Sequence, residues 1–188
     1  MDQTINLLIG FDAMRHFLQA RWEEEGRRSD DLANLLSSAE RDVVWNSRPL
    51  DVAQWFDWLD AALCVRPEFD DVKSAIQQAK TDWAEFNRAT EIASLPEREK
   101  VMDQLRTKEA SQAWHRVGFR PMSNLDAFEA MRVFVAAYWE RGHTTFSDVG
   151  AILTDLDRRD APFHVALWNK WCVAVDRAQT QALQWDKS

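Results

Sequence analysis

Apolar residues recur every three or four positions along most of this chain, which is the spacing of one face of an α-helix. Ser and Asp, which cap helices, or Pro, which favours a first turn, precede several of these runs. The helices that the pattern predicts cover residues 4–25 and 124–141 and begin near Ser29, Pro49, Ser147 and Pro162. The sequence therefore predicts an all-α protein.

The two ends of the chain are related in sequence. Residues 11–38 align without a gap with residues 128–155, and ten of the 28 aligned pairs are identical, whereas average composition would give about two. After a shortening of four residues, residues 49–58 align with residues 162–171. The chain is therefore predicted to contain two diverged three-helix repeats, in residues 1–66 and 121–188.

Apolar positions at helical spacing in both repeats are the predicted core. They are Phe11, Met14, Phe17, Trp22, Trp55 and Trp58 in the first repeat and Phe128, Met131, Phe134, Trp139, Trp168 and Trp171 in the second. A unit of this size buries little surface alone, so the repeats are expected to pack together around a pseudo-two-fold axis. The alternative is two separate beads joined by a helical connector.

Residues 67–120, between the repeats, have a different pattern. They predict a long helix over residues 67–93, a break at Leu95-Pro96, and a second helix that ends near Val117. This insert is too regularly patterned for a flexible linker, and we expect a helical hairpin that either clamps the two repeats or presents a surface.

The charge balance narrows the partners. With 31 acidic and 23 basic residues the formal net charge is -8, which disfavours binding to nucleic acid or an anionic membrane and suits a basic partner. The start of the chain lacks the basic segment of a signal peptide, and no apolar run has the length of a membrane span. Cys64 and Cys172 stand in apolar helical contexts, which predicts buried, reduced thiols and a cytoplasmic location.

Recognisable catalytic chemistry is absent from the sequence. His16, His115, His143 and His164 show no zinc-binding spacing, and no glycine-rich phosphate loop or nucleophile motif occurs. We therefore expect no metal, no cofactor and no enzymatic activity. An Arg is matched between the repeats (Arg15 and Arg132), as is a Glu (Glu23 and Glu140); these predict either surface or inter-element ion pairs or a polar network in a groove.

Clustered carboxylates are the candidate partner-binding residues. One cluster is Glu23, Glu24 and Glu25 with Asp30 and Asp31; the second is Asp57, Asp60, Glu68, Asp70 and Asp71; a third is Asp155, Asp157 and Asp160. The second is preferred, because only Arg66 and Lys73 lie near it in the sequence. Each cluster could equally be an ordinary solvated face.

The residues shared by the repeats carry a family resemblance. The segments Phe11–Leu63 and Phe128–Ala178 share an FxAMRxF start, a Trp-Glu pair and a trailing WxxW. In these features they resemble helical immunity proteins of bacterial polymorphic-toxin and contact-dependent inhibition loci. The resemblance does not extend to the insert. It implies a cytoplasmic protein without catalytic activity that binds a cognate toxin domain tightly.

Three functions follow as expectations. The first is an immunity-type protein whose acidic surface, with exposed Trp anchors, binds and neutralises a basic toxin domain. The second is a helical adaptor or effector-loading chaperone, which would leave its partner active. The third is a sensor or enzyme for a small molecule, with a pocket between the repeats.

Overall fold

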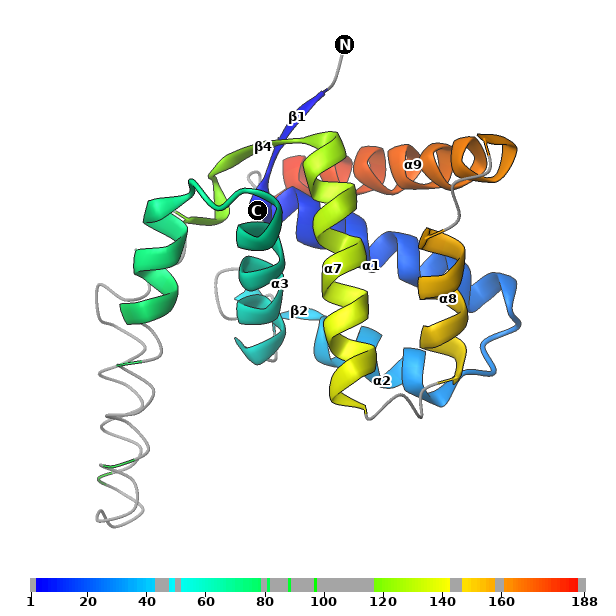
Figure 1. Cartoon of the computed structure of the whole chain (residues 1–188), viewed down its shortest axis with the longest axis horizontal. Helices are drawn as coiled ribbons and strands as arrows, with labels where there is room; N and C mark the ends of the chain where they lie inside the picture. The colour runs from blue at the N-terminus through cyan, green and yellow to red at the C-terminus, as the bar shows by residue number, and fades with distance from the viewer. Residues whose placement is uncertain are drawn as a thin grey trace.

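The structure of the chain is a computed structural model that describes residues 3–42, 48–49, 52–78, 81, 88, 97, 117–142, 147–157 and 161–185. Its helices are α1 (Leu7–Glu24), α2 (Asp30–Ser38), α3 (Val52–Val65), α7 (Asn124–Arg141), α8 (Ser147–Asp157) and α9 (Ala161–Trp185). Its strands are β1 (Thr4–Asn6), β2 (Arg41–Asp42), β3 (Arg48–Pro49) and β4 (Pro121–Ser123). The described chain is mostly helical (Figure 1), which confirms the predicted all-α class.

The starts of two predicted helices differ from the structure. Helix α1 begins at Leu7 and not at residue 4, because Asn6 is extended (φ -105°, ψ 167°) and its side chain accepts a hydrogen bond from the Ile9 N–H. Helix α3 begins at Val52, and Pro49 belongs to β3. Helix α7 has the predicted bounds, with the Ser123 hydroxyl accepting from the Asp126 N–H at its start.

The segments that precede α1 and α7 form a short antiparallel pair that the helical periodicity did not predict. In its register Thr4 faces Ser123, Ile5 faces Met122 and Asn6 faces Pro121. The pairing continues into the helices, because the Leu7 N–H donates to the Arg120 carbonyl at 3.0 Å and the Asn124 N–H donates to the Gln3 carbonyl at 2.8 Å. These bonds fix the starting points of α1 and α7 beside each other.

The main helix contacts join the N-terminal and C-terminal parts of the chain. Helix α1 packs along α9, and α3 packs along α7. Figure 1 shows α3 beside α7, with α9 running above α1. Each of these contacts joins a helix of the N-terminal part of the chain to one of the C-terminal part.

Most of the predicted core residues lie inside this packing. Phe11, Met14, Phe17, Trp55, Trp58, Phe128, Met131, Phe134 and Trp171 are buried, and Trp22, Trp139 and Trp168 are half-buried against them. The burial predicted for the two cysteines is wrong: Cys64 is exposed and Cys172 is half-buried. Cys64 lies off the buried stripe of α3, which runs through Trp58, Leu59 and Ala62.

Apart from the single residues 81, 88 and 97, only the ends of the predicted insert are described. Residues 70–78 are helical, with Phe69, Val72 and Ile76 buried, and residues 117–118 end a helix before β4. The predicted break at Leu95-Pro96 and the hairpin as a whole lie outside the described residues. Among the helices that the structure describes, none combines the length and apolar character needed to cross a membrane.

Candidate functional site

The first aromatic cluster joins α1 to α3. The Phe11 ring meets Trp55 and Trp58 edge to face, with ring centroids 5.5 and 6.1 Å apart. The indole N–H of Trp58 donates to the carbonyl oxygen of Leu7 at 2.9 Å. A buried indole needs such an acceptor, so Trp58 is used entirely inside the fold.

The second aromatic cluster repeats this arrangement at the aligned positions. The Phe128 ring meets Trp168 and Trp171 edge to face, with both pairs of centroids 5.7 Å apart. The indole N–H of Trp171 donates to the side-chain oxygen of Asn124 at 2.6 Å. The tryptophans at these aligned positions thus serve packing.

Two further ring contacts connect these two clusters. Phe17 of α1 meets Trp171 of α9 at 6.5 Å, and Phe134 of α7 meets Trp58 of α3 at 6.4 Å. Their interplanar angles are 60° and 65°. We call these two contacts the aromatic seam. The Trp side chains that the structure describes are buried or half-buried, so the expected exposed Trp anchor is not among them.

The first acidic cluster is engaged by basic residues of the same molecule. Glu23 accepts hydrogen bonds from Gln19 at 2.9 Å and from Arg27 at 3.0 Å, and these bonds, that from Gln19 foremost, hold the pKa of its carboxyl below the usual value. Glu24 pairs with Lys170 of α9 at 2.7 Å, and Glu25 pairs with Arg21 at 3.2 Å.

The second acidic cluster lies near more basic residues than the sequence indicated. Asp57 pairs with Arg141 at 2.7 Å, and Asp71 pairs with Arg120 at 3.4 Å. Both arginines come from distant parts of the chain, so the folded cluster has basic neighbours besides Arg66 and Lys73, the two that lie near it in the sequence. No sequence signal for these pairs exists, because they depend on the packing of α3 against α7 and on the turn before β4.

Arg66 and Arg120 have a structural role beneath this cluster. Arg66 binds Asp126 at 2.7 Å and also contacts Glu68, and these hydrogen bonds, that to Asp126 first, raise its pKa. Both guanidiniums lie over the buried ring of Phe69, at 5.1 Å and 4.7 Å from its centroid. Such contacts hold a guanidinium in a fixed place.

The structure separates the second cluster into two parts. Asp60, Glu68, Asp70 and Asp71 are exposed, near the end of α3 and the start of the helical segment 70–78. Asp57 is only half-exposed and is directed to α7 through its pair with Arg141. We call the four exposed carboxylates the acidic surface.

The third acidic group also forms internal pairs. Asp155 accepts a hydrogen bond from Arg21 at 2.9 Å, and Asp157 accepts one from Arg132 at 3.1 Å. These bonds attach α8 to α1 and to α7. Asp160 lies outside the described residues.

The matched arginines bind acids one helical turn earlier in their own helices. Arg15 pairs with the buried Asp12 at 3.5 Å, and Arg132 pairs with Glu129 at 3.0 Å. Positions 12 and 129 are aligned in the two repeats. The matched Arg positions thus contribute local ion pairs on α1 and α7, whereas Glu23 pairs with Arg27.

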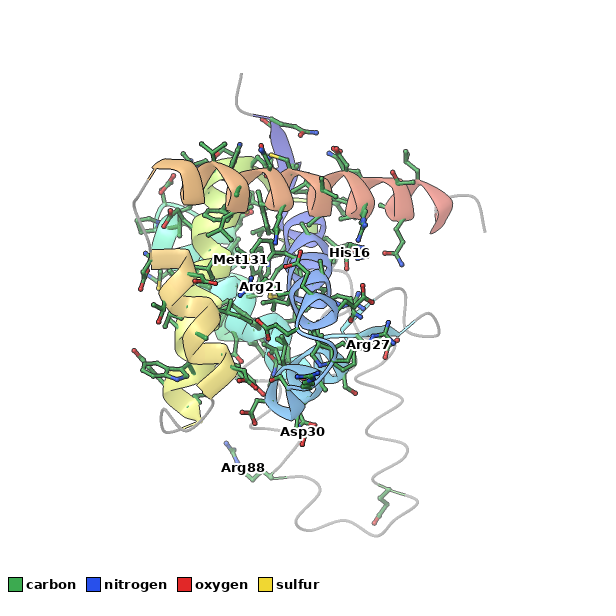
Figure 2. All side chains as sticks on the ribbon, turned by 90° about the vertical axis from the view of Figure 1, so that its right-hand side faces the viewer. His16, Arg21, Arg27, Asp30, Arg88 and Met131 are labelled. Carbon is green, nitrogen blue, oxygen red and sulfur yellow. The ribbon has the colours of Figure 1, made fainter. Side chains whose placement is uncertain are left out.

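A shallow groove of about 560 Å³ runs between α1 and α9 and is lined by His16, Val173, Asp176, Arg177, Thr180 and Gln181. Figure 2 shows His16 on α1, just below α9. A ring nitrogen of His16 lies 3.1 Å from the Gln181 side-chain oxygen. Burial lowers the pKa of His16, against the opposing effects of Gln181 and Asp12.

The described part of the chain contains no group of three or more His, Cys, Asp or Glu residues placed to hold a metal ion. Comparisons with models of protein families, with curated proteins and with solved structures found no match for this chain. The candidate site is therefore defined by its geometry alone.

Proposed function

We propose that this chain is an immunity-type protein that binds and neutralises a basic toxin domain through its acidic surface. The observation that carries the proposal is that the shared aromatic side chains pack inside the fold, whereas the carboxylates of the acidic surface are exposed. The aromatic residues shared by the repeats make matching contacts inside the fold, with the indoles of Trp58 and Trp171 bonded internally. Recognition is thereby left to the exterior, where the repeats differ.

The acidic surface has the properties that a basic partner needs. Asp60, Glu68, Asp70 and Asp71 are exposed, and pairs between exposed charges are weak because water screens them. A partner's Lys and Arg side chains can therefore compete for these carboxylates. Complementary charge also accelerates the encounter of two proteins.

The test is co-expression of this chain with the toxin domain encoded beside it. We expect growth to be restored, and the purified proteins to form a one-to-one complex. The double variant Asp60→Lys/Asp70→Lys should weaken that complex at least tenfold and restore toxicity. Asp30→Lys, at an exposed position of the first acidic cluster on α2, is the control and should still protect.

Each outcome assigns a function. Cell death with the wild-type chain present would contradict neutralisation. A stable complex in which the toxin stays active would identify the adaptor or chaperone instead. A small molecule retained by the groove around His16 in native mass spectrometry, and lost in His16→Ala, would favour the sensor.

We also propose that the two repeats are related by a pseudo-two-fold axis that passes between Ile5 and Met122. Positions 5 and 122 are equivalent under the alignment extended to these strands, and these two residues face each other in the β1–β4 pair. The bonds from Leu7 to Arg120 and from Asn124 to Gln3 exchange with each other under the same relation. The aromatic seam does so too, because Phe17 corresponds to Phe134 and Trp58 to Trp171.

A further inference from the structure

Two ion pairs lie where the third helix of one repeat meets the first helix of the other. Glu24 of α1 pairs with Lys170 of α9 at 2.7 Å. Asp57 of α3 pairs with Arg141 of α7, also at 2.7 Å. They occupy the two principal helix contacts of the molecule, α1 with α9 and α3 with α7.

The two ion pairs stand at equivalent positions with their charges reversed. Glu24 aligns with Arg141 in the first helices, and Asp57 aligns with Lys170 in the third helices. The first repeat therefore carries an acid at both positions, and the second repeat carries a base at both. Each pair joins an acid of the first repeat to a base of the second.

This reversal affects what each repeat can pair with. If the first repeats of two chains packed on each other, Glu24 of one chain would face Asp57 of the other. If the second repeats did so, Arg141 would face Lys170. Like charges in contact repel each other and therefore oppose such pairing. Each like-charge contact would occur twice where two identical repeats pair, because each chain contributes both residues.

The aromatic seam provides no such discrimination. It contains a Phe and a Trp from each repeat, so pairing between identical repeats would again place Phe against Trp. Arg21 also approaches Glu24, at 3.8 Å, but from the same helix. That contact would remain whichever partner α1 packs on.

We propose that the two reversed ion pairs are specificity determinants that direct each repeat to the other repeat and oppose a dimer in which identical repeats of two chains pair. The proposal rests on the repeat architecture and is independent of toxin binding. The dimer that these charges oppose is one formed with a second copy of this chain.

The experiment exchanges one ion pair in the full-length chain. The variant Glu24→Lys/Lys170→Glu keeps opposite charges within the α1–α9 contact and leaves the net charge unchanged. It gives each repeat one acid and one base at the exchanged positions, so pairing between identical repeats becomes complementary at these two contacts. We expect its dimer association constant, measured by light scattering after refolding over a concentration series, to rise at least tenfold above wild type.

The matched control exchanges both ion pairs. Adding Asp57→Arg/Arg141→Asp to the first variant gives the first repeat two bases and the second repeat two acids, which restores the repulsion between identical repeats. We expect this variant, which carries four substitutions, to dimerise no more than wild type. All variants keep opposite charges in the α1–α9 and α3–α7 pairs. Both exchanges lose the Arg21–Glu24 contact alike, so it does not distinguish one exchange from the other.

The outcomes are decisive in both directions. A dimer in the single exchange that is absent in the double exchange, and a difference that shrinks in high salt, would support the proposal. Equal dimerisation of wild type and the single exchange, or of both exchanges, would overturn it. If the first variant does not fold by circular dichroism, Asp57→Arg/Arg141→Asp alone poses the same question at the α3–α7 contact. Two chains can also exchange unlike repeats, so that the first repeat of one packs on the second repeat of the other. This exchange preserves every ion pair, and it therefore contributes equally to dimerisation of wild type and of all variants.

Discussion

Gly10 and Gly150 each stand against a tryptophan ring. A Cβ added to Gly10 would lie 2.9 Å from a ring carbon of Trp58, and one added to Gly150 would lie 2.9 Å from the indole nitrogen of Trp139. The surroundings of the two rings differ. Trp58 is fully buried and bonded to Leu7, whereas Trp139 is half-buried.

At the residue scale we therefore expect alanine to be tolerated at position 150 but not at position 10. Gly10→Ala should lower the free energy of unfolding by about 1–3 kcal/mol, because the fixed Trp58 ring cannot retreat. Gly150→Ala should be close to neutral, because Trp139 can shift and alanine favours a helix by up to ~1 kcal/mol. Urea denaturation measures both, and equal losses would contradict the account.

Capping decides where the two first helices begin. Asn6 and Ser123 stand at equivalent positions, one residue before α1 and α7, and each accepts a hydrogen bond from the N–H three residues later. Ser29 does the same for α2 through the Leu32 N–H at 3.1 Å. These side chains satisfy amides that the helix cannot.

At the element scale, exchanging the caps should be tolerated and removing them should not. Asn6→Ala and Ser123→Ala are each expected to lower stability by about 1 kcal/mol, whereas Asn6→Ser and Ser123→Asn should lie within about half of that, because both residues are good caps. Thermal unfolding followed by circular dichroism distinguishes the two sets. A loss as large in the exchanges as in the alanine variants would mean that the hydroxyl and amide are held by other contacts.

The elements show what a sequence can and cannot reveal here. The bounds of α7 and the cap of α2 follow from local signals, namely apolar periodicity and Ser residues. The β1 strand does not, since residues 4–6 become extended only by pairing with β4, more than a hundred residues away. The same reason hid the basic partners of the second acidic cluster, because Arg120 and Arg141 approach it only in the folded chain.

At the scale of the whole molecule, the packing of α9 on α1 sets the environment of His16. Desolvation lowers its pKa, and the charged groups that act on it are Asp12 and Arg15 from α1 and Arg177 from α9. The neutral imidazole is therefore the form that the folded protein favours. Below the ordinary histidine pKa the unfolded chain takes up a proton that the folded chain resists.

Stability should consequently fall as the pH decreases from 7 through the unfolded pKa of about 6.5 toward the lower folded pKa. His16→Gln removes this titration and should show a smaller loss over the same interval. Urea denaturation of both proteins at pH 7.0 and 5.5 makes the comparison. Parallel losses in the two proteins would show that other groups account for the acid sensitivity.

Helix α1 is synthesised long before α9, the helix that covers it. Until α9 leaves the ribosome, the side of α1 that α9 covers, which includes Phe17, can be shielded only by temporary contacts, for example with chaperones. Completion of the native core is therefore expected after translation of α9, and a ribosome stalled before residue 161 would hold a chain whose first helix still lacks its permanent neighbour.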